Sequence, residues 1–179
     1  QVKHLTLLLD EILSYSKAQS VGLDFNPSPV ELESFCQEIV APIQMNAPKQ
    51  RLDVILETDL CRTVTIDSKL MSQVISNLLS NALKYSPDGN SVELTVTCDP
   101  QQVTFRVADH GIGIPEEDRK RLFEAFHRAS NVGGIPGTGL GLAIVKQAVD
   151  AHRGSITVES EVGKGTSFIV MIPQIEQLQ

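Results

Sequence analysis

The sequence predicts an α/β domain of two layers, a two-layer α/β sandwich in which helices cover one face of a mixed or antiparallel sheet. Segments that alternate apolar and polar residues occur in adjacent pairs, as the strands of hairpins do. Amphipathic helical segments lie between these pairs. The chain has 179 residues, of which 41% are hydrophobic, and this is enough for one such domain and a short extra element but not for two domains.

The extra element is a helix expected at the start of the chain. Apolar residues recur at spacings of three and four from Val2 to Ile12 and give this helix one apolar seam. Gly22 and the Asn-Pro-Ser-Pro run at 26–29 then interrupt regular structure. An alternative is that this helix folds back on the main domain. The expected division is a helix at 1–21, a linker at 22–28 and the main domain at 29–179.

Six regular elements are expected between residue 30 and residue 109. Pro29 suits the first turn of the first helix, and Asp67 suits the N-cap of the second. A turn at Asp99-Pro100 joins the last two strands in a hairpin. In order, the elements are a helix at 30–43, strands at 52–57 and 63–66, a helix at 68–85, and strands at 92–97 and 103–107.

A long connection rich in Gly, Pro and charged residues follows at 110–139, with one short helix expected at 118–126. Loops of this length are usually lids or binding loops. Regular structure resumes afterwards, with a turn at Gly163-Lys164-Gly165 between the last two strands. The remaining elements are a helix at 140–152 and strands at 155–159 and 166–172.

Composition excludes several function classes. The formal net charge of −7 opposes binding to nucleic acid, so any bound anion must be held by local donors or a metal ion. Cys36, Cys61 and Cys98 lie far apart and fit no metal-ligand spacing, so we expect small buried side chains in a reducing compartment. No run approaches 18 apolar residues, which predicts a soluble fragment and leaves open whether a longer parent crosses a membrane.

The helix at 68–85 carries a polar face. Asn77, Asn81, Lys84 and Tyr85 recur at helical spacing, while the other positions are apolar enough to hold the helix against a core. Amide oxygens suit Mg²⁺, and a nearby lysine adds a positive charge for phosphate. Taken alone, this pattern is more typical of asparagines that hydrogen-bond a neighbouring loop.

A second cluster, Asp109 to Pro115, follows an expected strand and places one carboxylate beside two glycines. Glycine lets a backbone approach a ligand closely. A carboxylate here could accept a hydrogen bond from the exocyclic amino group of adenine and would reject guanine, which presents a carbonyl. The alternative is an ordinary Asp-Gly turn.

A third cluster, the glycine-rich run at 133–142, ends where a helix is expected to begin. Backbone amides and the positive end of a helix dipole hold phosphate groups, so a triphosphate is a natural ligand. Neither Gly-x-x-x-x-Gly-Lys-Ser/Thr nor a strand-linked Gly-x-Gly-x-x-Gly is present. We interpret Gly163 to Thr166 as a hairpin turn because it lies between two strands.

Phe123, Phe126 and Arg128 lie between the second and third clusters. The two phenylalanines could pin the long connection to the domain while the arginine reaches a terminal phosphate with its fork of donors. The alternative is a surface helix with a packed apolar face.

Taken in order and spacing, the four segments resemble the N, G1, F and G2 boxes of sensor histidine kinases of bacterial two-component systems. That family belongs to a wider group with gyrase-type topoisomerases and mismatch-repair ATPases. The resemblance spans about residues 29–173. It implies the two-layer sandwich called the Bergerat fold, with ATP between the helix of the N box and a mobile lid. It also implies a cytoplasmic domain, whether or not the parent is anchored in a membrane.

The resemblance implies roles for the motif residues. Asn81 would coordinate Mg²⁺, and Asp109 would read adenine. Asn77, Lys84 and Arg128 would act on the phosphates and are the catalytic candidates. His127 departs from the family pattern, where tyrosine is frequent, and this puts a packing contact in doubt. The expected nucleotide-binding set is Asn77, Asn81, Lys84, Tyr85, Asp109, Gly111, Gly113, Ile114, Phe126, Gly137, Thr138, Gly139, Leu140, Gly141 and Leu142.

The phosphoacceptor of the family is missing from this sequence. It lies in a His-Glu-x-x-[Thr/Asn]-Pro context, which none of His4, His110, His127 and His152 has. The first helix resembles the second helix of the dimerisation and phosphotransfer bundle. The resemblance therefore implies a fragment that binds ATP without phosphorylating itself, from a homodimeric parent whose bundle histidine passes the phosphoryl group to a response-regulator receiver domain.

Three other functions are weighed. An ATPase clamp is disfavoured because such ATPases usually place a glutamate where Asn77 stands. A degenerate module that only binds nucleotide or a partner is disfavoured by the intact boxes. A dinucleotide-dependent oxidoreductase is disfavoured because no strand precedes the loop at 137–142.

Overall fold

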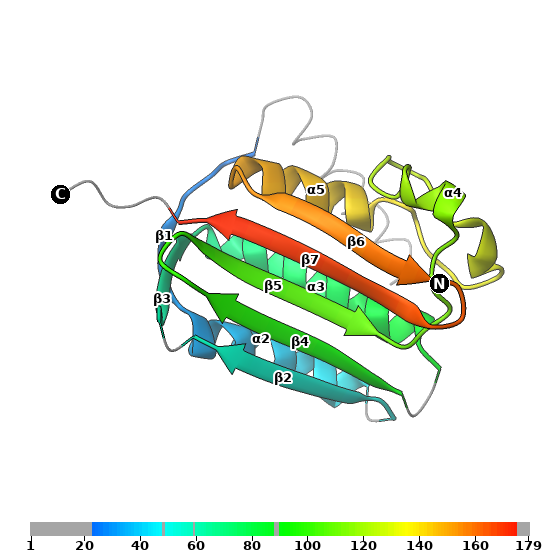
Figure 1. Ribbon diagram of the computed structural model, residues 1–179, viewed down its shortest axis with the longest axis horizontal. Coiled ribbons are helices and arrows are strands. Elements are labelled where there is room, and N and C mark those ends of the chain that lie inside the picture. The colour runs from blue at the N-terminus through cyan, green and yellow to red at the C-terminus, as the bar shows by residue number, and fades with distance from the viewer. Residues whose placement is uncertain (1–22, 48, 59, 88–89, 175–179) are drawn as a thin grey trace, which may run out of the picture.

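The computed structural model describes residues 23–47, 49–58, 60–87 and 90–174. Within them, five strands form one mixed sheet in the order β2-β4-β5-β7-β6. Figure 1 shows helices α2, α3 and α5 together on one face of this sheet. The predicted two-layer sandwich is therefore confirmed. The strands are β2 (Arg51–Glu57), β4 (Ser91–Cys98), β5 (Gln102–Asp109), β6 (Ser155–Glu161) and β7 (Gly165–Pro173), and the helices are α2 (Leu32–Asn46), α3 (Ser68–Tyr85) and α5 (Gly141–Ala151).

The core lies between the sheet and the helices. Burial alternates along β4 and β5, so that every second side chain faces the helices. Phe105 at the centre of β5 is fully buried, as are Leu78 and Leu79 on α3. Burying each such side chain contributes about 1.5–3 kcal/mol, and this apolar layer therefore holds α3 in place.

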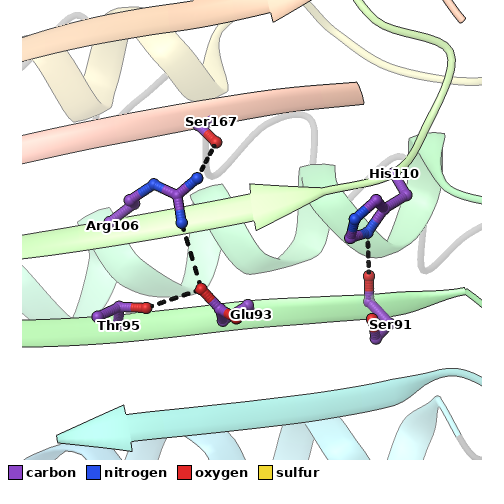
Figure 2. Close-up of polar contacts among 6 residues, drawn as sticks. All are labelled: Ser91, Glu93, Thr95, Arg106, His110 and Ser167. Carbon is purple, nitrogen blue, oxygen red and sulfur yellow. Dashed lines mark hydrogen bonds and ion pairs between the residues drawn. The ribbon is translucent and has the colours of Figure 1, made fainter. Parts of the chain in front are cut away.

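The other face of the sheet is polar, and Figure 2 shows its best-connected part. Arg106 on β5 lies 3.2 Å from Glu93 on β4 and donates a 2.9 Å hydrogen bond to Ser167 on β7. Thr95 donates to the same Glu93 carboxylate at 2.9 Å. Half-exposed ion pairs contribute little stability, about 1 kcal/mol or less, so this network serves mainly to fix the register of three strands.

Helix α3 has the predicted bounds because its start is strongly capped. The Asp67 carboxylate is 5% exposed and accepts from the Leu70 amide at 3.0 Å and from the Asn26 amide at 2.8 Å. The Asp67 amide donates to Nε2 of the buried His152 at 2.9 Å. Nδ1 of that histidine therefore carries the proton and donates to the Ala148 carbonyl at 2.7 Å. One aspartate thus ties the start of α3 to the end of α5.

Helix α2 begins two residues later than predicted. Pro29 and Val30 belong to strand β1 (Ser28–Glu31), which pairs antiparallel with β3 (Thr63–Ile66) in a separate two-stranded sheet. The Glu31 carboxylate accepts from the amides of Glu33 and Ser34 and caps the helix. Glutamate is not among the preferred N-cap residues, so this cap could not be predicted from its residue type.

Strand pairing also differs from prediction at one edge of the sheet. The expected hairpin of β4 and β5 is confirmed, as is that of β6 and β7. Strand β2, however, does not pair with its successor β3 but runs parallel to β4, which follows α3 in the chain. A parallel pair needs a crossover connection, and α3 supplies it.

The connection at 110–140, called the lid below, is less helical than predicted. Helix α4 (Glu116–Arg119) is one turn long, and a 3₁₀ turn, η1, follows at Ser130–Val132. Phe126 has a φ of 65°, in the left-handed region, which ends any helix. The predicted helix at 118–126 is therefore wrong.

Two of the three cysteines are paired, contrary to prediction. Cys61 and Cys98 form a disulfide across a Cα–Cα distance of 5.8 Å. Their 37-residue separation hid this contact, because β2 and the end of β4 come together only in the folded sheet. Cys36 is free and buried, and burial raises the pKa of its thiol to about 12.

Two further sequence expectations concern the chain's start and its relation to membranes. The helix expected at 1–21 lies outside the described residues, so the expected domain division stays a prediction. In the part of the chain that the structure describes, no helix is both long enough and apolar enough to span a bilayer.

Replacing Asp67 with alanine is expected to lower the free energy of unfolding by about 1–3 kcal/mol, because the first turn of α3 loses its cap and the Asn26 amide loses its acceptor. Urea titration followed by circular dichroism measures this change. Asp53→Ala, which removes an exposed partner of Arg51, is the control and should shift stability by less than about 1 kcal/mol. Equal effects of the two substitutions would contradict the role of Asp67.

Candidate functional site

A cavity of about 370 Å³ lies between α3, the end of β5, the lid and the start of β7. Most of the predicted site residues line its wall, although they come from segments up to 65 positions apart in the sequence. The predicted residues on the wall are Asn77, Asn81, Lys84, Tyr85, Asp109, Gly113, Ile114, Arg128, Gly137, Thr138, Gly139, Gly141 and Leu142.

Three predicted residues do not line the wall. Leu140 is fully buried beneath the start of α5. Phe126 is 64% exposed, because its left-handed backbone turns the ring outward. Gly111 supports the wall from behind, where its amide donates to Asp109 at 2.7 Å. A side chain at Gly111 would meet the Tyr85 carbonyl, since an added Cβ would lie 2.4 Å from that oxygen.

Helix α3 presents amide oxygen and positive charge to the cavity. The Asn77 amide nitrogen donates to the Gln73 carbonyl at 2.9 Å, which leaves its oxygen directed toward Gly141. A Cβ at Gly141 would lie 2.9 Å from that oxygen. The Lys84 ammonium lies 4.8 Å from the centre of the Tyr85 ring and close beneath Gly137. Glycine at 141 therefore allows the start of α5 to lie close to Asn77 on α3.

Asp109, the last residue of β5, also lines the cavity. Burial raises the pKa of this carboxyl above its ordinary value, although the amides of Gly111 and Thr166 donate to it. The adjacent His110 does not line the cavity and approaches the Ser91 carbonyl on β4, as Figure 2 shows. Asp109 is thus a half-buried carboxylate with lone pairs directed at a ligand-sized space.

The turn between β6 and β7 closes the cavity behind Asp109. The Gly163 amide donates to the Ile112 carbonyl at 2.9 Å, and Gly165 adopts a φ of 124° directly against the Asp109 carbonyl. The prediction of a hairpin turn here is confirmed. Thr166, at the end of this turn, lines the cavity and was missed, because only the pairing of β5 with β7 places it opposite Asp109.

The lid is pinned by apolar side chains at its middle. Leu122 is buried and Phe123 packs against the core, whereas Phe126 does not. The Phe126 amide donates to the Gly139 carbonyl at 3.0 Å and joins the two arms of the lid. Arg128 donates to the carbonyl of Ile135 within the lid, so in this conformation its guanidinium is held by backbone.

A buried carboxylate organises the lid from within. Asp118 on α4 accepts from the amide and hydroxyl of Ser130 at 2.8 and 2.7 Å, and Nε2 of His127 lies 3.3 Å from its second oxygen. The hydrogen bonds from Ser130 lower the pKa of Asp118, and His127 adds to this effect. His127 and the neighbouring Ala129 line the cavity, so this clasp of Asp118, His127 and Ser130 shapes one wall.

The amino end of α5 faces the same space without a side-chain cap. Leu140, the residue before the helix, provides no side-chain cap, and its own amide donates to the Thr138 hydroxyl at 3.1 Å. Uncapped amides carry partial positive charge and bind anions. Together with Lys84, they make this end of the cavity suited to phosphate groups.

The donor set allows a divalent cation only together with such a ligand. The described residues contain no cluster of three or more His, Cys, Asp or Glu side chains that could hold a metal. The side chains of Asn77 and Asn81 line the cavity instead, and each contains an amide oxygen. Hard neutral oxygens of this kind suit Mg²⁺ when phosphate oxygens complete its coordination.

Comparison with known proteins agrees with this geometry. A family model described as histidine kinase-, DNA gyrase B-, and HSP90-like ATPase matches residues 66–176, the segment that contains the whole cavity. The chain belongs to this ATPase family. Within the family, it is an ATP-binding catalytic domain of the sensor histidine kinase type.

Curated relatives are much longer than this chain. It is 34% identical to the circadian input-output histidine kinase CikA of Synechococcus elongatus, across 96% of this chain and 24% of that protein. It is also 34% identical to the sensor histidine kinase WalK of Bacillus subtilis, across 99% of this chain and 30% of that protein. The chain thus spans less than a third of the length of these relatives.

Solved structures of sensor kinases share the fold. Full-length ShkA in complex with AMPPNP superposes with a TM-score of 0.83 at 27% identity, covering 96% of this chain and 36% of that one. The mycobacterial sensor histidine kinase MprB superposes with a TM-score of 0.73 at 28% identity, covering 82% of this chain and 98% of that one. The ATPase domain described above therefore has the architecture of histidine kinase catalytic domains.

Asp118→Asn is expected to loosen the lid, because it removes the charge that Ser130 and His127 stabilise. Because the pKa of Asp118 is lowered, its carboxylate stabilises the lid fully at any pH above 3.8, the ordinary pKa of an aspartate. This stabilisation is lost as the pH falls through the lowered pKa. At pH 7 the variant should exchange the amide hydrogens of residues 118–130 about tenfold faster.

Hydrogen exchange followed by mass spectrometry measures this effect. Glu124→Gln, which breaks an exposed pair with Arg121, is the control and should leave exchange unchanged. Identical protection of the lid in the Asp118 variant and the parent chain would contradict the clasp.

Asp109 is expected to make nucleotide binding sensitive to pH. Its raised pKa means that the carboxyl gains a proton at a higher pH than an ordinary aspartate, so affinity for AMPPNP should begin to fall while the pH is still above 3.8. Asp109→Asn should weaken binding at pH 7 by about 10–100-fold and flatten this pH profile, while leaving the melting temperature unchanged or higher. Calorimetric titration measures both, with exposed Asp150→Asn as the control. A variant that keeps the parent's affinity and pH profile would remove Asp109 from the site.

Proposed function

We propose that this chain transfers the γ-phosphoryl group of ATP to a histidine nitrogen on a helical bundle of its parent protein. The observation that carries the proposal is the polarity of the cavity. Its wall carries both the Lys84 side chain with the first residues of α5, Gly141 and Leu142, and the Asp109 carboxylate. A nucleoside triphosphate with an amino group on its base matches these two groups of residues, the first through its phosphates and the second through its base.

In this proposal different residues bind the base and the phosphates. Asp109 accepts a hydrogen bond from the adenine amino group, and Tyr85 packs near the adenosine. Lys84 and the amides of Gly139 and Gly141 hold the phosphates, which places the reacting phosphorus in a fixed position. Arg128, released from the Ile135 carbonyl, would reach the γ-phosphate when the lid adjusts to the nucleotide.

Asn81, helped by Asn77, would hold the Mg²⁺ ion that accompanies the nucleotide. The ion would neutralise phosphate charge and orient the triphosphate. Asn77 is not a base, and an imidazole nitrogen needs none, because its lone pair is already nucleophilic. The nitrogen forms a bond to the γ-phosphorus while the bond between that phosphorus and the β,γ-bridging oxygen breaks, and ADP leaves with that oxygen.

Asn77 distinguishes this function from ATP hydrolysis. An ATPase must activate water, which calls for a general base near the γ-phosphate. Position 77 on α3 supplies an amide whose nitrogen is bonded to the Gln73 carbonyl, and an amide cannot accept a proton from water. A kinase with a nucleophile delivered from outside the domain therefore fits the cavity better.

We propose that the phosphoacceptor histidine and the receiver domain lie outside this chain. None of the four histidines lies in the phosphoacceptor context of the family, and His152 is in addition buried and hydrogen-bonded. We propose that residues 1–21 belong to the bundle that carries the histidine, that 22–28 form the linker, and that the catalytic domain is 29–179. The parent would act as a homodimer in the cytoplasm, where ATP is supplied, and would pass the phosphoryl group to a response-regulator receiver domain.

The deciding experiment has two stages. Calorimetric titration with AMPPNP, with and without Mg²⁺ and against GMPPNP, should show Mg²⁺-dependent binding of the adenine form only. The chain extended through its parent's bundle is then incubated with γ-labelled ATP, and acid-labile, base-stable label on the bundle indicates phosphohistidine. Binding without label would instead support a module that only binds nucleotide.

Asn81→Asp is expected to abolish transfer and to weaken Mg²⁺-dependent AMPPNP binding about tenfold or more, because it changes a neutral ligand to a charged one beside phosphate. Asn90→Asp, outside the cavity, is the matched control. Full transfer by the Asn81 variant would contradict the metal-binding role.

A further inference from the structure

The hydroxyl of Ser160 joins three parts of the wall behind Asp109. Ser160 lies near the end of β6, and its oxygen is 2.8 Å from the Ile114 amide, 2.9 Å from the Gly165 carbonyl and 2.9 Å from the Thr166 hydroxyl. Ile114 and Thr166 line the cavity, but Ser160 itself does not. It therefore acts on the site only through its neighbours.

Counting protons fixes the direction of each of these hydrogen bonds. A serine hydroxyl has one proton to donate and two lone pairs to accept with. The Ile114 amide can only donate, so it takes one lone pair, and the Gly165 carbonyl can only accept, so it takes the proton. The remaining contact uses the second lone pair of Ser160. Thr166 must therefore donate its own hydroxyl proton to Ser160.

This direction determines what Thr166 can offer to a ligand. Thr166 is 7% exposed, lies opposite Asp109 in the pairing of β5 with β7, and donates its amide to the Asp109 carboxylate. With its proton committed to Ser160, its hydroxyl oxygen can only accept. The cavity wall at this place then consists of acceptors alone, the Asp109 carboxylate and the Thr166 oxygen.

We propose that Ser160 is a specificity-determining positioning residue, which keeps Thr166 as an acceptor so that the site takes purines with an amino group at position 6 and rejects those with a carbonyl there. The inference rests on the proposed nucleotide site and extends it to a residue outside the cavity. Without Ser160, the Thr166 hydroxyl could rotate and donate to a carbonyl at position 6.

The test compares ADP with IDP, which differ at position 6 of the base, by calorimetric titration in the presence of Mg²⁺. Selectivity is the Kd for IDP divided by the Kd for ADP. Ser160→Ala should lower this selectivity about tenfold, mainly through tighter IDP binding, because the Thr166 hydroxyl is then free to donate to the carbonyl at position 6. Ser160→Thr keeps the hydroxyl and should restore selectivity. Ser155→Ala, at the exposed start of the same strand, should leave it unchanged.

A double-mutant cycle separates this role from simple support of the loop. In a Thr166→Val background there is no hydroxyl to orient, so Ser160→Ala should change selectivity no further. Melting temperatures show whether each variant folds, and Thr166→Val with Ser160→Thr carries the test if Ser160→Ala does not fold. Wild-type selectivity in Ser160→Ala, or an equal effect of it in both backgrounds, would overturn the inference while the nucleotide site stands. Failure of the parent chain to bind ADP would overturn the proposed function itself.

Discussion

The domain depends on one helix serving two environments. Helix α3 buries Leu78 and Leu79 against the sheet and turns Asn77 and Asn81 toward the cavity. A rotation that exposed the apolar stripe would cost several kcal/mol, at about 1.5–3 kcal/mol for each buried side chain. The amides therefore keep their direction whether or not a ligand is bound. Asp67 caps the start of α3 and is hydrogen-bonded to His152 at the end of α5. Both helices that line the cavity are therefore held by contacts with one residue.

Local signals made this helix and its polar face predictable. A favoured N-cap, an apolar stripe at 3.6-residue spacing and four polar residues on the opposite side all occur within one short segment, so no distant contact was needed to place Asn77 to Tyr85. Hairpins β4–β5 and β6–β7 were predictable for the same reason. The glycine run at 137–141 could be assigned to the cavity because it leads into the start of a helix, where backbone amides can hold phosphate groups.

Other features could not be read from the sequence because they depend on strand register between distant segments. Thr166 enters the wall only because β7 pairs with β5 so that it lies opposite Asp109, and β2 joins the sheet only after α3 has crossed over. The bond between Cys61 and Cys98 follows from that same crossover. The late start of α2 had a local cause, but glutamate is an unusual cap, and Phe126 occupies a backbone region that its residue type gives no reason to expect.

The conformation of Phe126 has a thermodynamic consequence for the lid. A left-handed backbone costs a residue with a side chain about 1–2 kcal/mol, and the ring gains no burial in return. The lid thus contains a residue that is unfavourably placed in this conformation, and releasing it offsets part of the cost of any rearrangement. A ligand that binds one conformation of the lid more tightly than another then changes which conformation predominates, so binding in the cavity would change the populations of the lid conformations.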